Sequence, residues 1–262
     1  MPQLQRPDGV EIHWEARGEG PPVVICHASF SLPSAFEPLI AELERDHRVV
    51  TYDPRGSGQS TRVGPYEIAT DATDMEALLE ELGEPAVLIG FGEGLHRNVQ
   101  VGHARPDLVL AAVSSGVAPL GPQARYGQLA GGLASSPSVL SALLQLFESD
   151  YRSGLRTVVE GGNSQLDDAQ VQARIDAVMA YSPRESTVGR IKSWIGYDSR
   201  DAARAMGDRL WILVFQGNLW FPEELVDVLR EEVPDAHIED IPDGPLSRPD
   251  TTAAVVRRIT HC

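Results

Sequence analysis

Short apolar runs alternate along most of this chain with segments in which apolar residues recur at helical spacing. The runs expected to form buried strands are 23–27, 48–53, 86–91, 110–116, 210–215 and 237–241. The clearest helix is expected over 68–82, where apolar residues fall 3.6 positions apart before Gly83. This alternation predicts an α/β protein with a mostly parallel, doubly wound sheet of about eight strands and helices on both faces.

The ends of the chain add further elements to this pattern. Residues 3–17 alternate between apolar and polar side chains around Asp8-Gly9, which predicts two opening antiparallel strands joined by a tight turn. Helices are also expected from Ser34 to about Arg45, after residue 94 to near Arg105, over 223–232 and over 251–259.

Residues 119–205 interrupt the alternation. They contain helical segments, for example 139–147 and 168–181, separated by joints rich in Gly, Ser and Gln. We therefore expect one core made of residues 1–118 and 206–262, with a helical cap inserted at 119–205.

The turn after the run 86–91 is the most informative stretch. Its residues, Gly90-Phe91-Gly92-Glu93-Gly94, match a sharp strand-to-helix turn flanked by small residues. In the pattern G-x-S-x-G, such a turn presents a nucleophilic serine at its centre, where this chain has Gly92. Such a turn is strained, so we expect Gly92 to have positive φ.

Six stretches are informative, in this order: VVICHAS, YDPRGSGQSTRV, GFGEG, YDSRDAARAM and QGNLWFP around the run 210–215, and IPDGPLSRPD. These motifs and their order resemble the α/β-hydrolase superfamily, and most of all the hydrolase-like domains that occur alone or joined to nucleotide cyclases in bacteria. In the resemblance, VVICHAS stands in place of a strand and His-Gly, YDPRGSGQSTRV for D-x-R-G-x-G-x-S, GFGEG for G-x-S-E-G, and IPDGPLSRPD in place of I-P-G-x-x-H.

The resemblance implies a Ser-His-Asp triad whose three positions are changed in this chain. Gly92 stands at the nucleophile position and Asn218 at that of the acid. The loop after Pro242, where the histidine should lie, reads Asp243-Gly244-Pro245-Leu246 and holds no histidine. We therefore expect a degenerate member without serine-hydrolase activity.

Several polar residues are expected near the former site. The resemblance places the two oxyanion-hole N–H groups at Glu93 and Ser29, and gives the loop with Asp53 and Arg55 a structural role. If the protein is a catalyst, the candidate groups are Glu93, His27 and His96. Arg97 is expected at the surface. The expected ligand pocket is formed by His27, Ser29, Gly92, Glu93, Asn218 and Trp220.

Net charge and cysteine content limit the partners and cofactors that we expect. The 262 residues carry a formal charge of −16 and have a pI of about 4.8, which disfavours nucleic acid and anionic membranes. The two cysteines, Cys26 and Cys262, give neither a disulfide framework nor a metal-binding spacing, so we expect a cytoplasmic protein without metal or cofactor. Neither a signal peptide nor a membrane span is expected.

Three functions stay open at this point. The first is a pseudo-hydrolase that binds or senses a small apolar molecule in the cavity between core and cap. The second is an enzyme that uses other residues on the same scaffold, such as a lyase, isomerase, cyclase or unconventional hydrolase. The third is a protein-interaction module. The sequence identifies neither the ligand nor the oligomeric state.

Overall fold

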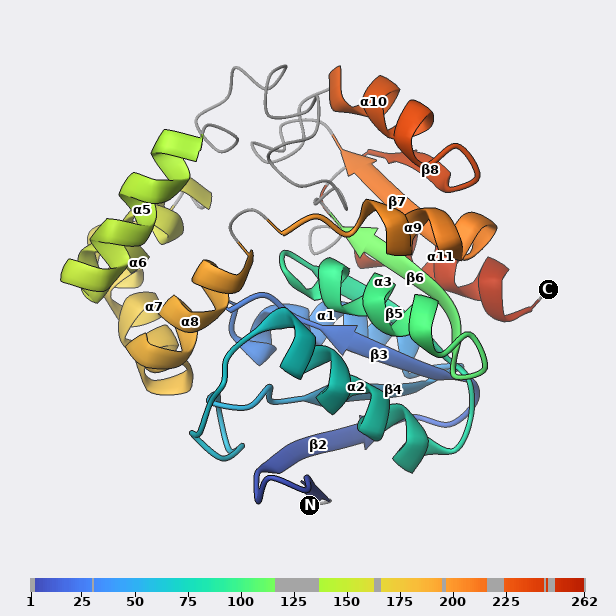
Figure 1. Ribbon diagram of the computed structural model, residues 1–262, viewed down its shortest axis with the longest axis horizontal. Helices are drawn as coiled ribbons and strands as arrows, with labels where there is room; N and C mark the ends of the chain where they lie inside the picture. The colour runs from blue at the N-terminus through green and yellow to red at the C-terminus, as the bar shows by residue number, and fades with distance from the viewer. Residues whose placement is uncertain are drawn as a thin grey trace.

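A single eight-stranded sheet forms the centre of the protein (Figure 1). The computed structural model describes residues 3–29, 31–115, 137–162, 166–194, 197–215, 224–242, 244 and 248–261. The strands, in spatial order, are β1 (Gln3–Gln5), β2 (Glu11–Arg17), β4 (Arg48–Tyr52), β3 (Pro22–Cys26), β5 (Ala86–Phe91), β6 (Val109–Ser115), β7 (Leu210–Phe215) and β8 (His237–Ile241).

The expected mostly parallel sheet is confirmed. β1 and β2 pair antiparallel, as do β2 and β4, and every other neighbouring pair is parallel. Within the parallel part, Cys26 pairs with Gly90, and Gly90 pairs with Ser114. The carboxyl ends of β3, β5 and β6 therefore lie side by side, which is where open α/β sheets place their sites.

Helices cover both faces of the sheet (Figure 1). Side chains of α2 (Ile68–Leu82), α3 (Gly94–Ala104), α9 (Arg200–Met206) and α10 (Glu224–Glu232) share one core with the strands. Those of α1 (Glu37–Leu43) and α11 (Pro249–Thr260) share the core of the other face. Because both faces are covered, β3 and β5 are buried along their whole length.

The first helix begins differently from the expectation. A 3-10 turn, η1 (Pro33–Phe36), precedes α1, and Ser34 makes no capping bond. Pro38 in the first turn of α1 explains the late start, since proline is tolerated there and not farther along a helix. A second 3-10 turn, η2 (Gly207–Arg209), leads into β7.

Of the described helices between β6 and β7 in the sequence, four gather beyond the arrowhead of β3 (Figure 1). They are α5 (Pro137–Ser149), α6 (Tyr151–Gly162), α7 (Asp168–Tyr181) and α8 (Arg184–Trp194). They share an apolar cluster of their own around Phe147, Leu155 and Ile175. The core and cap boundaries remain a prediction, and α9, at the end of the expected cap, packs on α3 in the main core.

The loop after β4 is fixed by a buried ion-pair network. Arg55, 2 % exposed, bonds both oxygens of Asp74 on α2, at 2.7 and 2.8 Å, and Asp8 at 2.9 Å. Asp53 accepts the Gln59 N–H at 2.9 Å. These contacts agree with the structural role expected for this loop, because a bidentate pair holds both partners in one geometry.

No helix in the part of the chain that the structure describes is long and apolar enough to cross a membrane.

Removing Asp74 should destabilise the fold strongly. Asp74→Ala leaves Arg55 buried without its bidentate partner, so we expect the free energy of unfolding to fall by about 3–5 kcal/mol. Asp107→Ala is the matched control, since Asp107 pairs with Arg105 at the surface and its removal should cost much less stability. Urea unfolding of both variants measures the difference; equal losses would contradict the structural role of the buried network.

Candidate functional site

Three glycines form the turn between β5 and α3. Gly92 has φ of +55°, which confirms the expected positive φ. A Cβ at Gly90 would lie 2.8 Å from the backbone of Leu95, and one at Gly94 would lie 2.5 Å from the carbonyl oxygen of Cys26. All three positions therefore disfavour a side chain, two because of close backbone approach and one because of its dihedral angles.

Ala28 lies directly beside the turn. A Cβ at position 92 would lie 2.8 Å from the Cβ of Ala28, closer than two carbons pack without strain. In the motif that the sequence resembles, position 28 is the glycine of His-Gly. The methyl group of Ala28 therefore occupies part of the space that a side chain at position 92 would need.

The carboxylate of Glu93 binds the loop after β3. Its Oε1 accepts the Ser29 N–H at 2.6 Å and also accepts the Ser29 hydroxyl. Both residues are buried. The backbone donor expected at Ser29 is therefore bonded to a carboxylate within the protein, and Ser29 has beside it a potential base that the sequence did not reveal.

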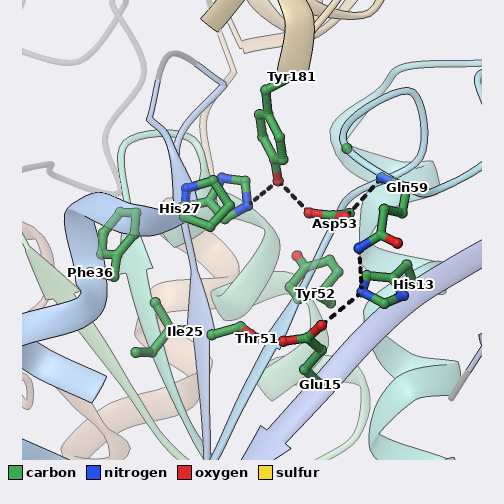
Figure 2. A pocket seen from close by; sticks show the side chains of 12 residues that line it. His13, Glu15, Ile25, His27, Phe36, Thr51, Tyr52, Asp53, Gln59 and Tyr181 are labelled. Atoms are coloured by element: carbon green, nitrogen blue, oxygen red, sulfur yellow. Dashed lines mark hydrogen bonds and ion pairs between the residues drawn. The ribbon is translucent and has the colours of Figure 1, made fainter. Parts of the chain in front are cut away.

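His27 is joined to α7 through Tyr181 (Figure 2). His27 Nε2 lies 2.9 Å from the Tyr181 hydroxyl, which donates to Asp53 Oδ1 at 2.7 Å. The Tyr181 hydroxyl thus links His27 to Asp53, and His27 Nδ1 lies 3.2 Å from the carbonyl oxygen of Ala28. Burial lowers the pKa of His27 to about 4 and raises the pKa of Tyr181, so both rings are neutral near pH 7.

These residues border a pocket of about 230 Å³ between β2, β3, β4, η1 and Tyr181 (Figure 2). It is lined by His13, Glu15, Ile25, His27, Pro33, Phe36, Thr51, Tyr52, Asp53, Gly58, Gln59 and Tyr181. We call it the His27 pocket.

The residues expected to form one pocket from the sequence are divided by the structure. His27 lines the His27 pocket, whereas Ser29, Gly92 and Glu93 form the contact between the loop after β3 and the turn. Asn218, Trp220 and most of the loop after Pro242 lie outside the described residues.

His96 is separate from these groups. Its Nδ1 lies 2.7 Å from the Ser199 hydroxyl, and its ring packs edge-on against Tyr197. Burial lowers its pKa to about 4. No hydrogen bond among the described residues joins His96 to Glu93, so they do not form an acid–base pair there.

Arg97 is buried, and its expected surface position is wrong. It is 2 % exposed, with its guanidinium 5.4 Å from the centre of the Tyr52 ring and 3.8 Å from Asp71 on α2. Its Nε and Nη2 are without a hydrogen-bond partner. The signal for a buried cation was Asp71 itself, which falls on the apolar face of α2 with Ile68 and Met75.

The described residues contain no cluster of three or more His, Cys, Asp or Glu side chains placed to hold a metal ion.

Comparison with known proteins supports the fold. A family model described as the α/β hydrolase fold matches residues 21–94. An esterase from Exiguobacterium antarcticum superposes with a TM-score of 0.83 over 99 % of each chain, at 20 % identity. The chain has the α/β-hydrolase fold.

Sequence comparison finds relatives that are named as hydrolases. RutD of Azorhizobium caulinodans, whose name gives carbamate hydrolysis as its expected activity, is 24 % identical over 88 % of this chain and 86 % of its own. The uncharacterised hydrolase YraK of Bacillus subtilis is 32 % identical over 35 % of each chain. The similarity shared with YraK thus covers about a third of the chain.

Filling the turn should cost stability in a way that depends on Ala28. We expect Gly92→Ala to lower the free energy of unfolding by about 1–3 kcal/mol, because it adds a side chain at positive φ and crowds Ala28. In an Ala28→Gly background the same change should cost only about 1 kcal/mol. Urea unfolding of the double-mutant cycle measures this coupling, and strictly additive losses would contradict the steric explanation.

The buried His96 should make stability depend on pH. Its pKa of about 4 lies below the unfolded value of 6.5, so the unfolded chain binds an extra proton between these pH values. Stability is therefore full above pH 6.5 and falls as the pH decreases towards 4. We expect His96→Gln to remove up to about 3 kcal/mol of this loss. Chemical unfolding at pH 7.5 and 4.5 measures it, with exposed His103→Gln as control; equal slopes in both variants would contradict the assignment.

Proposed function

We propose that this protein is a pseudo-hydrolase that binds a small, mostly apolar molecule between the sheet and the inserted helices. The observation that carries the proposal is the state of the turn after β5. It has a glycine at the nucleophile position, and the neighbouring Glu93 carboxylate occupies the Ser29 N–H.

Acyl transfer requires a nucleophile and free donors for the oxyanion. Gly92 has no side chain to form a covalent intermediate. A negatively charged carboxylate at the Ser29 N–H both occupies that donor and repels a developing oxyanion, a repulsion that is strong where water is excluded. Asn218 at the position of the acid could not balance an imidazolium charge.

Binding is supported by the His27 pocket. Its lining combines the buried apolar side chains of Ile25 and Phe36 with polar groups, a composition typical of small-molecule sites. Two large apolar side chains, Val63 and Leu110, are exposed in the described part of the chain. They give no support to an interaction module, which would need a contiguous apolar patch.

A second candidate is a hydrolase that uses Ser29. The Ser29 hydroxyl donates to Glu93, so the two residues form a nucleophile–base pair in contact, and the relatives are named hydrolases. No group among the described residues is seen to orient Glu93 as the third member of a triad would. We therefore favour binding over catalysis.

Chemical labelling distinguishes the two candidates. We expect no turnover of p-nitrophenyl esters and no stoichiometric labelling by a fluorophosphonate, with an active esterase of the same fold as positive control. Labelling of the parent protein that disappears in Ser29→Ala and persists in Ser31→Ala would overturn the proposal and favour the second candidate.

Restoring the serine alone should not restore hydrolysis. Gly92→Ser supplies a hydroxyl without a base to activate it and crowds Ala28. We expect its esterase rate to remain within about twofold of the parent protein, since removing a base from a triad costs several orders of magnitude. Steady-state assays at pH 7–9 check this; a rate at least tenfold higher would show that a base lies within reach.

A further inference from the structure

The His27 pocket combines negative charge with aromatic surface. Glu15 on β2, Thr51 on β4 and Ile25 on β3 are register partners, so they project from the same face of the sheet into one space. Figure 2 shows Asp53 and Tyr181 above this space and Glu15 below it.

The acidic side chains of the pocket have no Lys or Arg partner among the described residues that line it. The acids are Asp53 and Glu15; Oε1 of Glu15 lies 3.3 Å from Nε2 of His13, and the Glu15 side chain is 46 % exposed. His27 is neutral near pH 7 because burial lowers its pKa to about 4. Asp53 is 8 % exposed and receives only neutral donors, from Gln59 and Tyr181. A bound cation would therefore supply a positive charge that no Lys or Arg of this lining provides.

Aromatic rings form part of the wall of this space. The centroid of the His27 ring lies 6.0 Å from that of Phe36 and 5.6 Å from that of Tyr181. Tyr52 also lines the space, and the Arg97 guanidinium lies over its ring, 5.4 Å from the centroid. The faces of such rings attract organic cations, and they accept the methyl or methylene groups around a nitrogen as ordinary apolar contacts.

We propose that the His27 pocket binds a small organic ammonium ion, with its charge between Glu15 and Asp53 and its carbon substituents against Phe36 and Tyr181. The volume of about 230 Å³ limits the ligand to a few carbon atoms around the nitrogen. This inference rests on the proposed binding function and specifies the ligand class for the described pocket. It uses neither the turn at Gly92 nor the Ser29–Glu93 contact.

Choline and its uncharged carbon analogue, 3,3-dimethyl-1-butanol, test the charge requirement directly. In saturation-transfer NMR with irradiation of aromatic protons, we expect transfer to the choline methyl protons and at least fivefold weaker binding of the alcohol. Glu15→Gln should weaken choline binding about fivefold or more, since it removes one of two nearby charges. Glu19→Gln, which changes an exposed acid outside the pocket, should leave it within twofold.

The outcomes separate this inference from the broader proposal. Equal binding of choline and the alcohol would overturn the ammonium assignment while leaving a pocket for apolar molecules. Equal weakening by Glu15→Gln and Glu19→Gln would also overturn it, because the attraction would then come from the net charge of the protein. No binding of either compound would overturn it as well, whereas the labelling and ester assays above test the loss of hydrolysis by themselves.

Discussion

The close approach of the loop after β3 to the turn after β5 constrains the rest of the site. The carbonyl oxygen of Cys26 and the methyl group of Ala28 leave no room for side chains at Gly94 and Gly92. With the two segments pressed together, Glu93 at the start of α3 reaches the Ser29 N–H. The same contact thus fixes the start of α3 and occupies the Ser29 N–H. The close packing of the two segments is therefore linked to the proposed loss of hydrolysis.

The loop after β4 connects this centre to the inserted helices. Arg190 on α8 bonds the Arg55 carbonyl oxygen, Ser57 and Asp71, and Tyr181 on α7 bonds Asp53. Buried pairs of this kind hold their partners in one arrangement, because leaving any charge unpaired is costly. The loop therefore positions Tyr181 over the His27 pocket, so that a ligand there would contact both the sheet and α7.

The features that could be predicted from the sequence are those set by the spacing of residues close together in the chain. The sheet and α2, whose expected range of 68–82 is observed, follow from apolar spacing, and the positive φ of Gly92 follows from its place in a sharp turn. Contacts between distant segments could not be predicted, because polar residues such as Glu93 and Arg97 offer several partners. The His27 pocket was missed for the same reason. The one available signal was that His13 and Glu15, two positions apart on a strand, share a face.

The amide proton of Ser29 gives the most direct measurement of the central claim that Glu93 occupies this donor. In ¹⁵N–¹H NMR spectra at pH 7, a proton bonded to a carboxylate resonates far downfield and exchanges slowly with solvent. We predict that Glu93→Ala moves the Ser29 signal upfield and accelerates its exchange, while Glu19→Ala leaves both unchanged. A Ser29 signal that is the same with and without the Glu93 carboxylate would contradict the account.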